Sequence, residues 1–389
     1  MTKFKKTILF LHRWLGFISG IVVFIVSITG CIFCFQDEIQ DAFYSHRHVQ
    51  VQQKPYLEPS VLKGIAAKHK PTFKPGYLAY AGVDRPALLY MNSKTGTNVL
   101  YINPYDGKIL HDQDMFKDFF IIVEYIHLYL LLPANIGQLV VGISVIIFVV
   151  IMITGVVLWW PKRKSDRKRS FTIKWGGRWR RVNYDLHNVL GFYSLSIAII
   201  LAITGLAIAF EWMSDGIYLA GNMGKTYAIE KDEPKSDSLK KDLPIAGKPV
   251  IDRAYHQLRA LSPNAEMYTF YEDEAASGHI STGAYAKSLH FANSDSYDFD
   301  KYTGKILKGL PQTKKSLGLK LNEMNYDIHV GQIFGLTSKI IAFLASLICA
   351  SLPITGFIIW LGKRKKTKKP KGGREVTHKR AHVRQLKTN

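Results

Sequence analysis

Residues 12–35 read HRWLGFISGIVVFIVSITGCIFCF, and residues 187–210 read HNVLGFYSLSIAIILAITGLAIAF. The two stretches align without a gap, so that His12 matches His187 and a Thr-Gly pair falls at the same place in both. Self-similarity over this length indicates that a whole unit of the chain is duplicated. The repeat therefore decides the architecture before any single helix or strand is considered.

A second pair of matching stretches follows the first. Residues 154–163 read TGVVLWWPKR and residues 355–364 read TGFIIWLGKR. Each is the end of an apolar run, about 136–160 and 334–361, and His127 and His329 lie upstream at nearly the same spacing. The duplicated unit thus contains two hydrophobic stretches, each with a histidine near one end.

All four apolar stretches are long enough to cross a bilayer, since about 20 apolar residues cover a hydrocarbon core of about 30 Å. A secretory signal peptide is the alternative for the first stretch. That alternative fails because the run is too long, lacks a small-residue cleavage site and recurs later in the chain. The sequence predicts an α-helical membrane protein with four transmembrane helices.

Basic residues predict the orientation of these helices. Lysines precede the first span, residues 161–183 are rich in Lys and Arg, and a basic tail follows the fourth span. Both termini and the 161–183 loop are therefore expected on the cytoplasmic side of the membrane, and the two long loops on the external side. The formal net charge of +22 is explained by topology and by attraction to anionic lipid, so no nucleic-acid partner is predicted.

The two long loops also resemble each other. One ends LYINPYDGKIL at residues 100–110 and the other YDFDKYTGKIL at residues 297–307. A helix-like stretch precedes each, at Ser60–His69 and Ile251–Ser262, followed by alternating aromatic-rich runs that read as strands. Each half should therefore be a helix, a small external α+β lobe and a second helix, with residues 229–249 as a polar loop before the second lobe.

These features set the expected boundaries in the first half of the chain: 1–35 for the cytoplasmic N-terminus and first transmembrane helix, 36–117 for the first lobe, and 118–161 for a periplasmic helix and the second transmembrane helix. A basic cytoplasmic loop is expected at 162–183. In the second half the expected boundaries are 184–212 for the third transmembrane helix, 213–318 for the second lobe, 319–361 for the fourth transmembrane helix with its preceding segment, and 362–389 for a basic cytoplasmic tail.

The topology places the four histidines at two depths. His12 and His187 begin outward-running helices, whereas His127 and His329 precede inward-running ones. A pseudo-twofold axis along the membrane normal then sets His12 opposite His187 and His127 opposite His329. Two level histidines on facing helices are what a haem with two axial imidazoles requires. A single histidine at a membrane boundary is more often an interfacial polar residue, but four at duplicated positions favour a functional role.

Small residues in the spans have two explanations. Glycines would let a flat macrocycle approach closely, and tight helix packing explains them equally well; they are Gly16, Gly20, Gly30, Gly191 and Gly205. Cys31 and Cys34 form a CxxC inside an apolar helix and are expected to be small apolar filler rather than a redox pair. The segment His46-Arg47-His48 is expected to be solvated rather than metal-binding.

The sequence leaves open whether His127 lies inside a span or outside it. The break at Leu132-Pro133 places His127 either in the second span or on a short external helix ahead of it. No proline stands at the matching place before the fourth span, so the two halves are expected to differ on their outer side.

Together these stretches resemble the PepSY-associated transmembrane helix family, bacterial iron-regulated inner-membrane proteins that include ferric-siderophore reductases. The resemblance covers nearly the whole chain, and its motifs are HRWLG at 12–16, EYIHLYLLLP at 124–133, HNVLG at 187–191, DGK at 106–108 and TGK at 303–305. It implies haem b within the helices, PepSY-like lobes, and iron-siderophore chemistry in the periplasm.

The resulting hypothesis is a transmembrane ferric-siderophore reductase. Electrons from a cytoplasmic or quinone donor would pass through one or two haems b, held by His12, His187, His127 and His329, to a ferric-siderophore or other periplasmic iron chelate. Two alternatives stay open: a haem electron carrier with another acceptor, such as copper or a periplasmic redox protein, and a non-redox module in which membrane-anchored PepSY lobes bind a peptide or protease. A gradient-driven transporter is disfavoured because the spans lack intramembrane acids.

Overall fold

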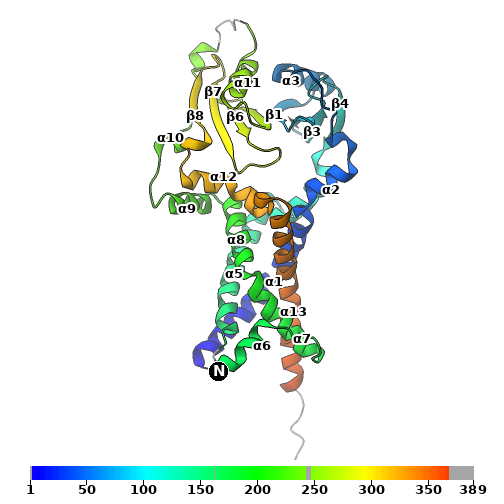
Figure 1. The fold of residues 1–389 in the computed structure, drawn as a ribbon, viewed down its shortest axis with the longest axis vertical. Helices are drawn as coiled ribbons and strands as arrows, with labels where there is room; N and C mark the ends of the chain where they lie inside the picture. The colour runs from blue at the N-terminus through cyan, green and yellow to red at the C-terminus, as the bar shows by residue number, and fades with distance from the viewer. Residues whose placement is uncertain (1, 162, 242–246, 368–389) are drawn as a thin grey trace, which may run out of the picture.

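The computed structural model describes residues 2–161, 163–241 and 247–367. Four long helices form a bundle, and two lobes lie at one end of it (Figure 1). We call this the lobe end, and the opposite end, where the chain begins, the terminal end. The helices long and apolar enough to cross a membrane are Lys3–Cys34, Ala134–Trp159, Trp179–Ala209 and Leu336–Lys363. The predicted fold class, four membrane helices with α+β lobes, is therefore confirmed.

The helices surround a common core in a ring. They are α1 (Lys3–Cys34), α5 (Ala134–Trp159), α8 (Gly191–Ala209) and α13 (Leu336–Thr367). Helix α1 packs against α5 and α13, and α8 packs against the same two helices. The two repeated helices α1 and α8 thus lie on opposite corners of the bundle, as a pseudo-twofold axis requires.

Two helices begin earlier than their apolar stretches. Helix α1 begins at Lys3, where the Thr2 side chain accepts a hydrogen bond from the Lys5 amide. The third span begins with α7 (Trp179–Asp185), which continues into α8 through the π-helical turn η4 (Leu186–Leu190). The expectation that His12 and His187 begin their helices is wrong, because Lys and Arg are good helix formers and extend the helix beyond the apolar run.

The lobes join in a single antiparallel sheet of order β4-β3-β2-β1-β5-β6-β7-β8. The strands are β1 (Lys74–Tyr80), β2 (Ala87–Ser93), β3 (Gly96–Ile102), β4 (Ile109–Asp114), β5 (Met267–Glu272), β6 (His279–Tyr285), β7 (Ser294–Asp300) and β8 (Ile306–Leu310). The first strands of the two lobes pair with each other, Ala79 opposite Thr269. The sequence predicts two lobes but not this pairing, which joins them in one continuous sheet.

One face of the sheet is covered by α3 (Pro59–His69) and α11 (Val250–Leu261), which match the two predicted helical stretches. Between helices and sheet lies a shared apolar core that includes Leu62, Tyr80, Tyr255 and Phe270, all buried. Glycine-containing turns shape the strand ends, where Gly107 and Gly304 have φ of 78° and 70°. The opposite face of the sheet is turned toward the membrane helices.

Short helices connect the spans to the lobes: α2 (Gln36–Phe43), α4 (Phe119–Tyr129), α9 (Glu211–Gly221) and α12 (Leu317–His329). The expected loop at 229–249 contains the end of a short helix, α10 (Ala228–Lys231), and a 3-10 turn, η5 (Ser238–Lys240). Residues 242–246 of that loop and residues 368–389 of the basic tail lie outside the described residues.

The two halves do not differ at their lobe end as expected. Helix α4 ends at left-handed Leu130 and Leu131 before Pro133, and α5 begins at Ala134. Helix α12 ends before Gly331 and Gly335, both with positive φ, and α13 begins at Leu336. Glycine provides in the second half the break that proline provides in the first, because it adopts positive φ at little cost. His127 and His329 therefore both lie on short helices outside the spans.

Candidate metal centre: two facing pairs of histidines

At the terminal end, His12 of α1 faces His187 across the core of the bundle. Their ring centroids are 6.4 Å apart and the rings are perpendicular. His187 lies in the π-helical turn η4, a distortion that is frequently found at functional sites. The turn joins the basic helix α7 to the apolar helix α8. The two histidines that the repeat equates are thus brought together.

At the lobe end, His127 in the last turn of α4 faces His329 at the end of α12. Their ring centroids are 6.0 Å apart, with an interplanar angle of 64°. The two pairs are well separated along the bundle. Val26, which contacts His127, follows His12 by 14 residues on α1, a rise of about 21 Å. The structure therefore has the facing pairs at two levels that the topology predicts.

Each histidine rests on a Thr-Gly pair of a neighbouring span. The Nδ1 atom lies within hydrogen-bond distance of the threonine hydroxyl in all four cases. The distances are 3.0 Å for His12 and Thr154, 3.1 Å for His127 and Thr29, 2.9 Å for His187 and Thr355, and 3.1 Å for His329 and Thr204. We call each Thr-Gly pair a histidine seat.

Backbone carbonyl oxygens contribute to the seats of His12, His127 and His329. Nδ1 of His12, His127 and His329 lies 3.2, 2.9 and 3.0 Å from the carbonyl oxygens of Ile151, Val26 and Leu201. A carbonyl oxygen can only accept, so Nδ1 must be the protonated nitrogen of these rings.

The threonine hydroxyls lead to the same assignment. Each donates its own hydrogen to a carbonyl of its helix, as Thr355 does to Ser351 and Leu352 and the other three do likewise. The hydroxyl oxygen therefore accepts from the histidine. Among the described residues, Nε2 of none of the four histidines has a hydrogen-bond partner, so the lone pair of Nε2 is free to bind a metal.

The glycine of each seat makes room for the ring. A Cβ on the glycine would lie close to Cε1 of the histidine: 2.8 Å for Gly205 and His329, 3.2 Å for Gly356 and His187, 3.3 Å for Gly30 and His127, and 3.4 Å for Gly155 and His12. Carbon atoms prefer about 3.5–4.0 Å. A side chain at these positions would crowd the imidazole and displace it from its seat.

Sequence reasoning left Gly30 and Gly205 between two explanations, cofactor approach and helix packing. The structure assigns Gly30 and Gly205 to a third role, the seating of a histidine ring. A usable signal was present: Thr-Gly occurs once in each of the four spans, as often as the histidine.

Burial keeps the lobe-end histidines neutral. These two histidines lie on α4 and α12, which are not themselves spans. Burial lowers the pKa of His127. Burial, and secondly the nearby charge of a protonated His127, lower the pKa of His329 to about 4. A neutral imidazole is the form that binds a metal.

The spacing of the pairs fits a metal held between two imidazoles. An imidazole nitrogen binds a metal at about 2 Å and lies about 1 Å from its ring centre, so two opposed rings have centroids about 6 Å apart. Among the residues described, no group of three or more His, Cys, Asp and Glu side chains could hold a metal. Two protein ligands per site suit a metal that brings its other ligands with it, as haem iron does.

The cysteines serve packing. Cys31, Cys34 and Cys349 are buried free thiols. The Cys31 thiol donates to the carbonyl of Phe343, and the Cys34 thiol donates to that of Val330. Both contacts link α1 to the second half of the bundle.

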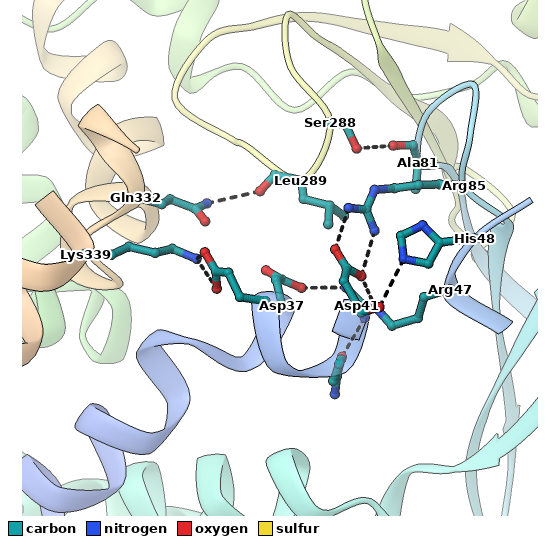
Figure 2. A network of polar contacts seen from close by, with 12 residues as sticks. Asp37, Asp41, Arg47, His48, Ala81, Arg85, Ser288, Leu289, Gln332 and Lys339 are labelled. Atoms are coloured by element: carbon teal, nitrogen blue, oxygen red, sulfur yellow. Dashed lines mark hydrogen bonds and ion pairs between the residues drawn. The ribbon is translucent and has the colours of Figure 1, made fainter. Parts of the chain in front are cut away.

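Within the segment His46-Arg47-His48, the expectation of a solvated chain holds for His48, which is exposed, but not for Arg47, which is only 9% exposed. Its guanidinium donates to Asp37 of α2 at 2.8 Å and to Asp41 at 2.6 Å, and Arg85 after β1 binds the same Asp41 at 2.7 Å (Figure 2). Two arginines thus share one carboxylate between α2 and the first lobe. This cluster, Asp37, Asp41, Arg47 and Arg85, we call the arginine clamp.

A cavity of about 230 Å³ lies between the open face of the sheet and the helices beneath it. The sheet contributes Tyr77, Tyr90 and Tyr101, the arginine clamp borders one side, and Tyr326 borders the other. Tyr326 precedes His329 by about one helical turn on α12, and neither His127 nor His329 is among the residues that line the cavity. Leu289 also lines it, held by Gln332 at 3.0 Å, while the neighbouring Ser288 donates to Ala81 (Figure 2).

The fold and these geometries define a class of protein: a duplicated membrane bundle with histidine pairs at two levels and a joined pair of lobes above one of them. The chain belongs to the family of the PepSY-associated TM region, which it matches over residues 9–363. The match spans all four histidines, all four seats and both lobes, and it confirms the resemblance drawn from the sequence motifs. None of the curated proteins compared with the chain matches it.

Proposed function

We propose that the protein is a haem b-containing reductase that passes electrons across the bacterial inner membrane to a periplasmic ferric-siderophore or similar chelate. The observation that carries the proposal is the fourfold repetition of one arrangement: a histidine whose Nδ1 is bound by a threonine, whose Cε1 rests on a glycine, and whose ring faces a second histidine at 6.0 or 6.4 Å. Ordinary helix packing does not require four copies of it.

The residues of the chain divide the work. His12 and His187 would hold one haem b at the terminal end, and His127 and His329 would hold a second at the lobe end. The seats hold each ring in one tautomer and one orientation, which makes Nε2 a stronger and better-aimed ligand. Haem b bound at each pair would supply one-electron transfer. The surrounding apolar helices exclude water from both levels.

Basic residues support an orientation with the terminal end of the bundle in the cytoplasm. The start of α1, the segment between α5 and α7 and the end of α13 share the terminal end of the bundle (Figure 1), and the Lys- and Arg-rich stretches of the sequence fall there. Basic ends remain in the cytoplasm. The lobes would then face the periplasm, and the donor would be a cytoplasmic reductant or a membrane quinol acting near His12 and His187.

The cavity beneath the sheet is the proposed docking place for the chelate. It is smaller than the roughly 300–1,000 Å³ of sites that enclose a whole drug-sized ligand, so it would receive one arm of a chelate whose iron lies toward His127 and His329. The charges of Arg47 and Arg85 are already matched by Asp37 and Asp41. This balance favours a ferric chelate of low net charge over a multiply anionic one.

The test is ferrous iron release by the protein in liposomes that contain dithionite. An uncharged ferric tris-hydroxamate outside is the substrate, and a ferrous-specific dye reports the product. We expect dye formation with the wild-type protein and its loss in His329→Ala and His187→Ala. The matched control is His69→Ala, which replaces an exposed lobe histidine and should leave the rate unchanged.

The proposed reductase activity would be refuted if the wild-type protein, the three variants and empty liposomes all released ferrous iron at the same rate. Reduction of a periplasmic redox protein or of copper, but of no ferric chelate, would instead identify an electron carrier with another acceptor. Reduction of a tris-catecholate faster than the hydroxamate would refute the charge argument alone.

A further inference from the structure

Helix α9 carries an apolar face that nothing in the described part of the chain covers. Trp212, Leu219 and Met223, which lies just past the helix end, are 57%, 41% and 91% exposed, and Gly216 and Ala220 are exposed between them. On α9 itself, Gly216, Leu219 and Ala220 follow Trp212 by four, seven and eight residues, so they fall on the same side of the helix. Met223 comes after the helix, with φ of 53°. An apolar stripe of this size, on a helix outside the spans, calls for a partner.

The other side of α9 is fixed to the second half of the protein. Tyr218 is buried, and its hydroxyl donates to Glu230 at 2.7 Å. Gly221 meets Gly318 of α12 so closely that a Cβ on Gly221 would lie 2.8 Å from the Cα of Gly318. Helix α9 is therefore held by its back to α12, the helix that ends at His329, and its apolar face points away from it.

The start of α9 is level with lipid-facing residues. The Gln138 side chain of α5 donates to the carbonyl of Ala209, the last residue of α8. The Phe210 ring packs on Gly142 of the same α5. At this level α5 still exposes Leu139 and Ile143. Since α5 is a span, these side chains face hydrocarbon, and α9 begins at the same depth.

The apolar face is continuous with the bundle. The ring centroid of Trp212 lies 6.2 Å from that of Phe210, which joins the stripe to the surface of the spans. Helix α9 lies across the axis of α8, at the level where α8 ends (Figure 1). A transverse helix with Trp at its start and an apolar stripe along one side is the pattern of a helix that lies in the membrane interface.

A second protein copy is a poorer occupant. A specific interface involves about 20–30 residues a side, and the stripe offers only Trp212, Gly216, Leu219, Ala220 and Met223. A lipid surface needs no such area, because each inserted side chain gains burial independently.

We propose that α9 is a bilayer-surface helix whose face of Trp212, Leu219 and Met223 lies among the lipids of the lobe-side leaflet and holds the second lobe at a fixed height. The first lobe is held differently. After α1 the chain continues into the acidic helix α2, which the arginine clamp ties to the first lobe by ion pairs (Figure 2). One lobe is thus secured to its span by charges, and the other by lipid.

The test places an environment-sensitive fluorophore on Leu219→Cys or Met223→Cys in the full chain, reconstituted in phosphatidylcholine–phosphatidylglycerol vesicles. The three native thiols are buried, and the unmutated protein measures their background labelling. The matched control is Tyr271→Cys, an exposed position on strand β5 of the sheet. Lipids that carry a nitroxide near the headgroup serve as the quencher.

We expect a blue-shifted emission and loss of most fluorescence at both α9 positions, and neither effect at Tyr271→Cys. Quenching at the α9 positions no stronger than at Tyr271→Cys would overturn the proposal. Quenching at α9 that weakens as the protein concentration rises would also overturn it, because it would mean that a second copy of the protein covers the helix. The readout is independent of haem, so it stands or falls separately from the reductase.

Discussion

Replacing Gly205 by alanine tests the histidine seats with a single methyl group. The new Cβ would lie 2.8 Å from Cε1 of His329, so the ring must withdraw by roughly 0.7–1.2 Å to regain ordinary carbon contact. Helix α8 carries the methyl group on one side and His127 faces the ring on the other. The withdrawal therefore moves the ring off its seat and alters the 6.0 Å separation of the lobe-end rings, which a metal between them needs.

The energetic cost can be bounded. Overpacking of this kind costs about 1–3 kcal/mol, and the substitution regains about 1 kcal/mol of helix propensity. We expect a net loss of up to about 2 kcal/mol in stability and, because a displaced ligand support typically weakens metal binding about 10–100-fold, loss of most haem from the lobe-end pair alone.

The assay is haem per chain by the pyridine haemochrome method, together with the thermal midpoint of the purified protein. Gly16→Ala is the matched control, because a Cβ there meets nothing within 4 Å; it should keep both haems and gain slight stability. Gly356→Ala, at 3.2 Å, should act more mildly, and on the terminal-end pair. If Gly205→Ala and Gly16→Ala behave alike, the seats do not position the histidines.

Three further changes probe other parts of the account. Thr204→Val keeps the shape of the seat but removes one of the two acceptors of His329 Nδ1, which should weaken haem retention about 10-fold or more and shift the midpoint potential, measured by redox titration; an unchanged potential would argue against the seat. Asp41→Asn should destabilise the first lobe by about 1.5–3 kcal/mol in a denaturant melt at neutral pH. In the wild type, burial alone would raise the pKa of Asp41, but Arg85 and Arg47 outweigh it and bring the pKa to about 2. Because this lies below the unfolded value of 3.8, the stabilisation is complete above about pH 5 and is lost as pH falls toward 2; a stability difference between wild type and Asp41→Asn that stays the same from neutral pH down to pH 2 would contradict it. Ser60→Ala removes the hydroxyl that donates to buried Asp252 at 2.6 Å, and should lower the melting temperature of the joined lobes, followed by circular dichroism, at a cost of about 1–3 kcal/mol; no change would show that this contact between the lobes is dispensable.

The repeat makes the bundle predictable because duplication imposes symmetry. Once the four spans and their directions are known, His12 must lie level with His187 and His127 with His329. Local signals were equally good for α3, α11 and the strands that follow them. The start of α1 was missed, since hydropathy marks the lipid-facing length rather than the helical length.

Long-range pairings were beyond the sequence. The two lobes join through β1 and β5, where three residue pairs separated by nearly half the chain meet, and no local pattern specifies that edge. The Thr-Gly seats were visible as repeats, but their partners lie on other helices. The break before α13 was missed because it depends on the positive φ of Gly331 and Gly335 rather than on a proline.

The measurement closest to the central claim is a reduced-minus-oxidised absorption spectrum of the purified protein from haem-replete cells, beside His187→Ala and His329→Ala. We expect low-spin b-type bands with two haems per chain, and one haem fewer in each variant. Absence of haem from the wild-type protein would contradict the account and leave a membrane-anchored PepSY module whose paired histidines serve another purpose.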